Sequence, residues 1–194
     1  MSTAVKTPAL IMLVGFSYLF YRFYTNPADV SLLDDLSSTA QTIGDYMSPS
    51  DIPFPCVDPE TGRDYTEAIK NAARASGTPA LLIASLIRQE SKFKASVRNS
   101  RSGAMGLGQF MPDTAAEYFG SDWAVAVYKP DRAIPQTARY LMWLYRRHGT
   151  WRLAVAAYNW GTGNVATKGL ALAPAETRDY VRIVYDTFST TLPA

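Results

Sequence analysis

The chain has 194 residues, of which 47% are hydrophobic and 19% are charged, the balance of an ordinary globular protein. Its net charge of +2, without a block of basic residues, gives no indication of nucleic-acid binding. The single cysteine, Cys56, excludes an internal disulfide and a multi-cysteine metal site. Length and composition therefore indicate one domain with appendages.

The first segment, residues 1–24, contains an uncharged apolar run from Pro8 to Tyr21 between Lys6 and Arg22. This run is shorter than the roughly 20 residues of a comfortable membrane span, although the tyrosines near its end are typical of the membrane interface. Residues 20–24 are bulky and offer no small-residue cleavage site. We therefore expect an uncleaved hydrophobic anchor. A cleaved signal peptide and a buried helix of the domain are the alternatives.

Residues 25–62 form a predicted linker that is rich in Asp, Ser, Thr and Pro. Its first part, residues 29–47, has apolar residues at a spacing that suits a partial helix. The prolines that follow favour an extended chain; they are Pro49, Pro53, Pro55 and Pro59. The composition predicts a tether that holds the next domain away from a membrane or orders against a partner.

Residues 63–190 read as a succession of helices without the alternating pattern of strands, which predicts an all-α domain. Helices are expected at residues 65–75, 80–92, 113–119, 132–148 and 151–158, with residues 121–131 irregular. Pro174 is expected to open a last helix, with Glu176 in its first turn and Tyr180 on its apolar face.

The helix at residues 80–92 carries one acidic residue, Glu90. Ile83, Leu86 and Ile87 precede it at helical spacing, so Glu90 continues a core-facing stripe. Burial penalises the charged form of a carboxyl and raises its pKa, and a glutamate can then act as a general acid near neutral pH. The alternative is a structural glutamate that pairs with an arginine such as Arg88 or with a residue of another helix.

Two glycine-containing segments follow this helix. The first, Gly103 to Gly108, contains three glycines that permit positive φ and close backbone approach, which predicts a shaped loop beside the acid. In the second, residues 156–163, a buried helix ends at a polar amide, Asn159. From the residues alone, Asn159 is expected to cap this helix end.

Three separated motifs carry a family resemblance. They are Glu90-Ser91, then Ser100-x-x-Gly103-Ala104-x-Gly106-Leu107-x-Gln109-Phe110-Met111-Pro112-x-Thr114-Ala115, then Ala157-Tyr158-Asn159-x-Gly161. In this order they resemble the soluble lytic transglycosylase family, which has a goose-lysozyme-like α-helical fold and cleaves peptidoglycan. The resemblance spans about Tyr65 to Phe188 and implies a lysozyme-like helical domain.

The resemblance also implies site residues. Glu90 would be catalytic, and substrate contacts would come from Ser91, Ser100, Gln109, Met111, Tyr158, Asn159 and Tyr180. Tyr180 resembles the tyrosine of a further family motif that approaches the glutamate, and its buried hydroxyl needs a partner such as Glu90. From the sequence alone, loop or core roles stay open for these side chains. Gly108 stands where the family often has a bulkier residue such as methionine, so we expect a wider or more mobile groove there.

Most glycoside hydrolases use two carboxylates, but no second acid accompanies Glu90 in the matched motifs. The resemblance implies that the substrate supplies the nucleophile. Glu90 would protonate the bond between N-acetylmuramic acid and N-acetylglucosamine, and the muramoyl 6-hydroxyl would attack to form a 1,6-anhydromuramoyl end, without metal or organic cofactor. The alternatives are a hydrolytic goose-type muramidase and a wall-binding assembly component with little turnover.

The expected partners are peptidoglycan glycan strands and, through the N-terminal segment, a membrane. We expect the catalytic domain to face the bacterial cell wall in the periplasm, or to be carried in a phage virion. A small anchored domain suits localised wall opening better than bulk turnover. The candidate settings are a secretion machine, a conjugation machine and phage genome entry.

Overall fold

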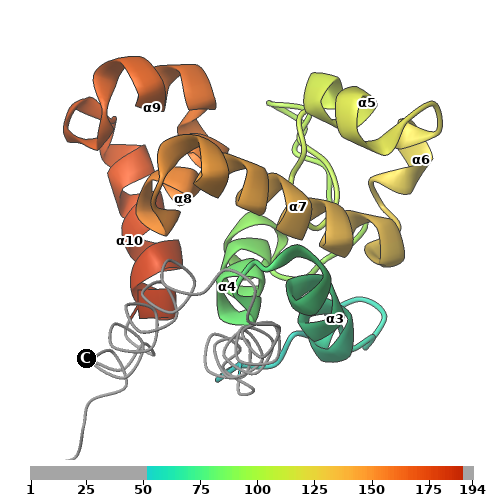
Figure 1. Ribbon diagram of the computed structural model, residues 1–194. Helices are drawn as coiled ribbons and strands as arrows, with labels where there is room; N and C mark the ends of the chain where they lie inside the picture. Colours follow the sequence, from blue (N-terminus) through green and yellow to red (C-terminus); the bar gives the residue numbers. More distant parts are fainter. Residues whose placement is uncertain (1–51, 190–194) are drawn as a thin grey trace, which may run out of the picture. The chain divides into compact units, whose positions relative to one another are not determined.

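The computed structural model describes residues 52–189, which fold into a helical domain (Figure 1). Regular secondary structure in this range is helical, apart from isolated β-bridges. The expected all-α class is therefore confirmed. The predicted anchor, residues 1–24, lies outside the described residues, as do residues 25–51 of the predicted linker. No helix between residues 52 and 189 is long and apolar enough to cross a membrane.

The helices are α3 (Thr66–Ser76), α4 (Ala80–Ser91), α5 (Pro112–Phe119), α6 (Trp123–Ala126), α7 (Pro130–His148), α8 (Trp151–Trp160), α9 (Thr162–Lys168), η1 (Leu170–Leu172) and α10 (Ala175–Ser189). All six expected helices are present, with ends that differ by one or two residues. Residues 121–131 were expected to be irregular. This expectation is wrong for residues 123–126, which form α6, and for residues 130–131, which begin α7. The sequence pattern does not predict α9 and η1, which are short and lack a long apolar period.

Helix α4 lies in the interior of the domain, in contact with α3, α7 and α10 (Figure 1). Every residue from Ala80 to Ile87 is at most 5% exposed. A helix that is apolar on all sides is stable only when other elements cover it completely. This burial brings the end of α4, where Glu90 lies, into a poorly solvated position.

Helix α7 crosses the domain between two groups of helices (Figure 1). Helices α8, α9 and α10 lie at its C-terminal end, and α5 and α6 lie toward its N-terminal end. Pro130 fits the first turn because the backbone N–H it lacks has no partner there. Gly149 ends the helix with a φ of 83°, which glycine adopts without steric cost. The two groups flank α7 and the end of α4.

Residues 52–62 pack on the domain, although they belong to the linker that the sequence predicts. Cys56 and Asp58 are buried, and the Arg88 guanidinium lies 4.5 Å from the centre of the Phe54 ring. Burial raises the pKa of the Cys56 thiol to about 11, so the thiol keeps its proton at neutral pH. At this end of the predicted linker the chain is packed rather than extended.

Candidate active site

Glu90 is the penultimate residue of α4 and is half-buried. Burial raises the pKa of its carboxyl to about 7, and a hydrogen bond from Tyr180 opposes this rise. None of the ion pairs among residues 52–189 includes Glu90. Arg88 lies over Phe54 instead, so the alternative of an Arg88 partner is wrong. Near neutral pH this carboxyl can both give and accept a proton.

Tyr180 of α10 donates a hydrogen bond from its hydroxyl to Oε1 of Glu90. Helix α10 packs along α4, and Tyr180 is buried. The expected contact between the two side chains is therefore confirmed. Burial and the charge of Glu90 both raise the pKa of Tyr180, so its hydroxyl keeps the proton that it donates.

Tyr158 of α8 ties this helix to the glycine-rich loop. Its hydroxyl donates a hydrogen bond to the carbonyl oxygen of Gly108 at 2.7 Å. The rings of Phe110 and Tyr140 pack against the Tyr158 ring at centroid distances of 6.2 and 5.4 Å. Burial and then the charge of Glu90 raise the pKa of Tyr158, so its hydroxyl keeps the proton that it donates to Gly108.

Gly108 is buried, and the space beside its Cα is filled. A Cβ at this position would lie 2.6 Å from Oγ1 of Thr137, 2.7 Å from Cε2 of Phe110 and 2.9 Å from the hydroxyl oxygen of Tyr158. The expectation of a wider groove at Gly108 is therefore wrong, whereas greater mobility there stays a prediction. The sequence missed this because the three neighbours come from separate parts of the chain, and Gly108 allows them to approach the backbone closely.

Gln109 shapes the same loop. Its φ is 48°, an uncommon value for a residue other than glycine. Its side-chain nitrogen donates to the carbonyl oxygens of Gly106 at 3.0 Å and of Val97 at 3.4 Å. These bonds connect the loop with the turn that follows α4 and agree with the loop alternative. A substrate contact by Gln109 stays a prediction.

Asn159 lies within α8, where its Oδ1 accepts a hydrogen bond from the Thr177 hydroxyl at 2.9 Å. The helix continues to Trp160 and Gly161 is its C-cap, so the capping interpretation of Asn159 is wrong. Thr177 was not among the predicted site residues. Thr177 precedes Tyr180 by three residues and shares its helix face, which is the signal that could have identified it. The first half of α10 therefore contacts both Asn159, through Thr177, and Glu90, through Tyr180.

The three remaining predicted site residues, Ser91, Ser100 and Met111, make no hydrogen bond to Glu90 among the described residues. Ser91 is buried, and its hydroxyl donates to the carbonyl oxygen of Ile87 at 3.1 Å, one turn back in α4. Ser100 is exposed in the turn before Gly103, and Met111 is 46% exposed just before α5. The substrate roles of Ser91, Ser100 and Met111 stay predictions.

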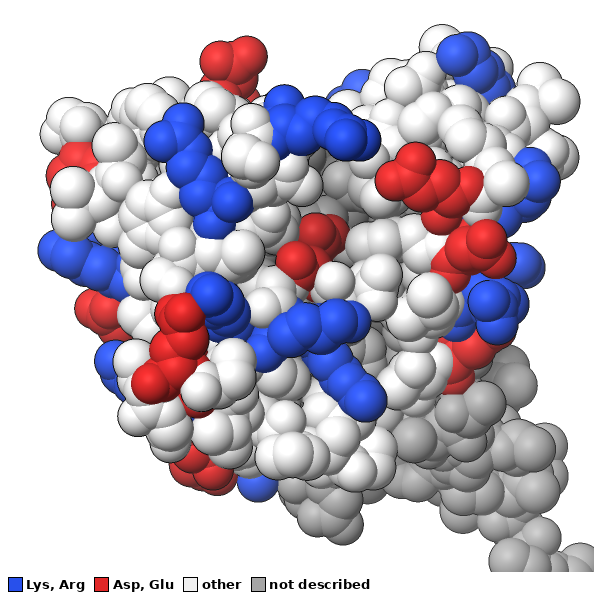
Figure 2. Space-filling view, turned by 180° about the vertical axis from the view of Figure 1, so that it is seen from behind, with Lys and Arg blue, Asp and Glu red and all other residues white. Residues whose placement is uncertain are grey.

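The face of the molecule opposite to that in Figure 1 is hollowed near its centre (Figure 2). An acidic side chain lies inside the hollow, with lysine and arginine side chains above and below it and further acidic side chains to its right (Figure 2). Burial raises the pKa of Glu90 and the hydrogen bond from Tyr180 lowers it. No other carboxylate contributes to this shift. Residues 52–189 contain no cluster of His, Cys, Asp and Glu that could hold a metal ion. The arrangement offers one acid that can transfer protons in a partly desolvated site.

Residues 67–180 match the family described as the Transglycosylase SLT domain, and this range is more than half of the chain. The chain belongs to this family. Two solved structures are similar to the SLT domain. The first is an inactive mutant of the lytic transglycosylase Slt from Pseudomonas aeruginosa, with 28% identity, a TM-score of 0.54 and coverage of 66% of this chain. The second is the 70 kDa soluble lytic transglycosylase of Escherichia coli, with 28% identity, a TM-score of 0.57 and coverage of 64%. The match covers only 24% and 23% of those longer proteins.

Proposed function

We propose that this chain is a peptidoglycan lytic transglycosylase. The observation that carries the proposal is Glu90, whose pKa is raised to about 7 and whose carboxyl accepts a bond from Tyr180. A general acid works best when its pKa lies near the working pH, because both protonation states are then accessible. Membership of the SLT family supports the substrate class, and the two similar structures are named as lytic transglycosylases.

In the first step Glu90 donates its proton to the glycosidic oxygen between N-acetylmuramic acid and N-acetylglucosamine. The bond from that oxygen to C1 of the muramoyl residue breaks, and the N-acetylglucosamine side leaves with a hydroxyl. The N-acetyl group of the muramoyl residue can assist by partial bonding to C1. Glu90 becomes a carboxylate, and the Tyr180 hydroxyl stabilises it through the hydrogen bond to Oε1.

In the second step the muramoyl 6-hydroxyl attacks C1 of the same sugar. Glu90 accepts the hydroxyl proton, a new C1–O6 bond closes the 1,6-anhydro ring, and the acid returns to its starting state. No water is consumed, so one carboxyl is sufficient, whereas hydrolytic enzymes generally need two. Attack within one sugar also avoids the entropy cost of bringing a second molecule into position.

The loop and helix ends around Glu90 are proposed to hold the glycan. Tyr158 holds the glycine-rich loop through its bond to Gly108, and Gln109 connects that loop with the turn that follows α4. Asn159, Ser91 and the exposed Ser100 and Met111 complete the set of proposed substrate contacts.

Mass spectrometry of the muropeptides released from purified peptidoglycan tests this function. The wild-type protein should release products that are lighter by one water than the products of hydrolysis, and Glu90→Gln should release none. Products with reducing ends would make the enzyme a goose-type muramidase. Wall binding without products from either protein would identify a binding component.

We propose further that the N-terminal segment anchors the enzyme to a membrane with the domain toward the cell wall. Such an enzyme would open the wall locally, for a secretion or conjugation machine or during phage genome entry. Fractionation of cells or virions that produce the full-length protein tests this proposal. Recovery of the protein in a membrane or particle fraction, released by detergent, is the expected result. Recovery as a free periplasmic protein would contradict it.

A further inference from the structure

The segment that precedes the matched SLT residues holds a buried carboxylate, Asp58, which is 2% exposed. Its Oδ1 accepts bonds from the backbone N–H groups of Glu60 at 2.9 Å and Thr61 at 3.2 Å. Its Oδ2 accepts bonds from the hydroxyl of Tyr65 at 2.8 Å and from the N–H of Ala95 at 3.1 Å. Burial alone would raise the pKa of Asp58, but these bonds hold it below its ordinary value. The carboxylate is fully bonded, and one of its four bonds reaches a distant part of the chain.

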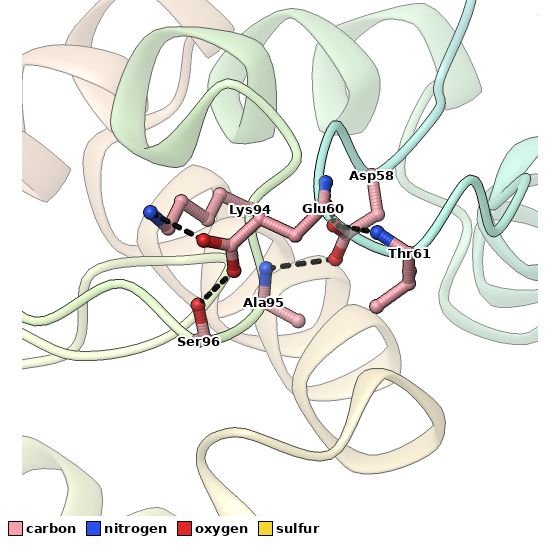
Figure 3. A network of polar contacts seen from close by, with 6 residues as sticks. All are labelled: Asp58, Glu60, Thr61, Lys94, Ala95 and Ser96. Carbon is pink, nitrogen blue, oxygen red and sulfur yellow. Dashed lines mark hydrogen bonds and ion pairs between the residues drawn. The ribbon is translucent and has the colours of Figure 1, made fainter.

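A second carboxylate of the same turn reaches the same place (Figure 3). Oε1 of Glu60 lies 2.6 Å from Nζ of Lys94, and its Oε2 accepts a bond from the Ser96 hydroxyl. Figure 3 shows that the side chains of Asp58 and Glu60 both point from the 58–61 turn toward residues 94–96. We call these contacts between residues 58–61 and 94–96 the clasp.

The clasp holds the turn that connects Glu90 with the glycine-rich loop. This turn begins directly after α4 with Lys92 and Phe93, whose φ values of 54° and 64° are unfavourable for residues other than glycine. Two such residues in succession persist only where surrounding contacts hold them. Beyond the turn, the carbonyl oxygen of Val97 accepts bonds from the N–H of Gly106 at 2.9 Å and from the side chain of Gln109 at 3.4 Å. A displacement of the turn would therefore move the loop relative to the acid.

We infer that Asp58 is a positioning residue for the proposed reaction, which fixes the glycine-rich loop relative to Glu90 through its bond to Ala95. The matched family range begins at residue 67, so Asp58 lies outside it. The role rests on the proposed function, since it is defined by turnover. With this role, the residues around Asp58 are a functional part of the active site rather than a tether.

Asp58→Asn in the full-length protein tests this role. The amide keeps the shape of the carboxylate, but only one of its two polar atoms can accept hydrogen bonds, so it cannot satisfy all four donors. On soluble glycan strands we expect kcat to fall about tenfold or more with KM changed less, because small displacements of a catalytic group have effects of this size. Amide exchange at Ala95 and Gly106 should accelerate by at least about tenfold as the turn loosens.

Asp64→Ala is the matched control, because Asp64 lies in the same segment but bonds the N–H of Thr66 at the start of α3. It should lower stability without changing kcat per folded molecule. Equal kcat values for Asp58→Asn and wild type, both fully folded, would overturn the inference. If Asp58→Asn does not fold, Tyr65→Phe replaces it, because it removes the other hydrogen bond to Oδ2 of Asp58; unchanged kcat with unchanged exchange at Ala95 would then overturn the inference. If the wild type has no turnover, the proposed function fails, and the exchange rates alone then decide whether the clasp holds the loop.

Discussion

Replacement of Glu90 by glutamine should stabilise the protein at alkaline pH and leave its stability almost unchanged at acid pH. In the unfolded chain the carboxyl ionises near its ordinary pKa of 4.5, whereas burial raises the pKa in the folded protein to about 7. Between these values the folded protein keeps a proton that the unfolded chain has lost, so a rise in pH favours unfolding. Glutamine resembles the protonated acid and does not ionise.

The size of the effect follows from the pKa. Each pKa unit corresponds to about 1.4 kcal/mol, so ionisation of Glu90 should cost the folded protein up to roughly 3 kcal/mol above neutral pH. Urea unfolding of the wild type and Glu90→Gln at about pH 4 and about pH 8.5 measures this difference. Glu67→Gln is the control, because the Glu67 side chain is 75% exposed and should change little at either pH. A Glu90→Gln difference that is the same at both pH values would show that the acid is not desolvated.

Three further substitutions probe the contacts around the acid. Tyr180→Phe removes the hydrogen bond that lowers the pKa of Glu90. The pH at which kcat/KM has fallen by half on the alkaline side should therefore move upward. An unchanged or lower value would contradict the contact. Gly108→Ala should lower the free energy of unfolding by about 1–3 kcal/mol in urea, because its Cβ would lie 2.6 Å from Oγ1 of Thr137; unchanged stability would refute this packing. Tyr158→Phe leaves the carbonyl of Gly108 without its bond and should cost about 1 kcal/mol in the same assay together with a lower kcat/KM, whereas wild-type values for both would exclude the proposed fixing of the loop.

The sequence predicted those features that depend on local pattern. The apolar period of residues 80–87 predicted both the central helix and the poor solvation of Glu90, because one helix face carries both. The contact between Tyr180 and Glu90 was predicted from a resemblance and from the need of a buried hydroxyl for a partner. Short elements with few apolar residues, such as α9, were missed because their stability comes from packing on α8 rather than from their own sequence.

The features that the sequence did not predict depend on contacts between distant residues. From the sequence, Gly108 predicts a wide or mobile groove, but Thr137 and Tyr158 fill the space beside it. Residues 52–62 read as a proline-rich tether, but Asp58 bonds to Ala95, 37 positions away in the chain. No local pattern records such pairs, since each partner alone is an ordinary loop or core residue.

Digestion of peptidoglycan in water labelled with heavy oxygen would show whether Glu90 serves a reaction within the substrate or an attack by water. We expect the wild-type protein to release anhydromuramoyl products without label, since the muramoyl 6-hydroxyl supplies the oxygen that joins C1, and Glu90→Gln to release none. Reducing ends that carry the label would show that water is the nucleophile and would contradict the proposed reaction.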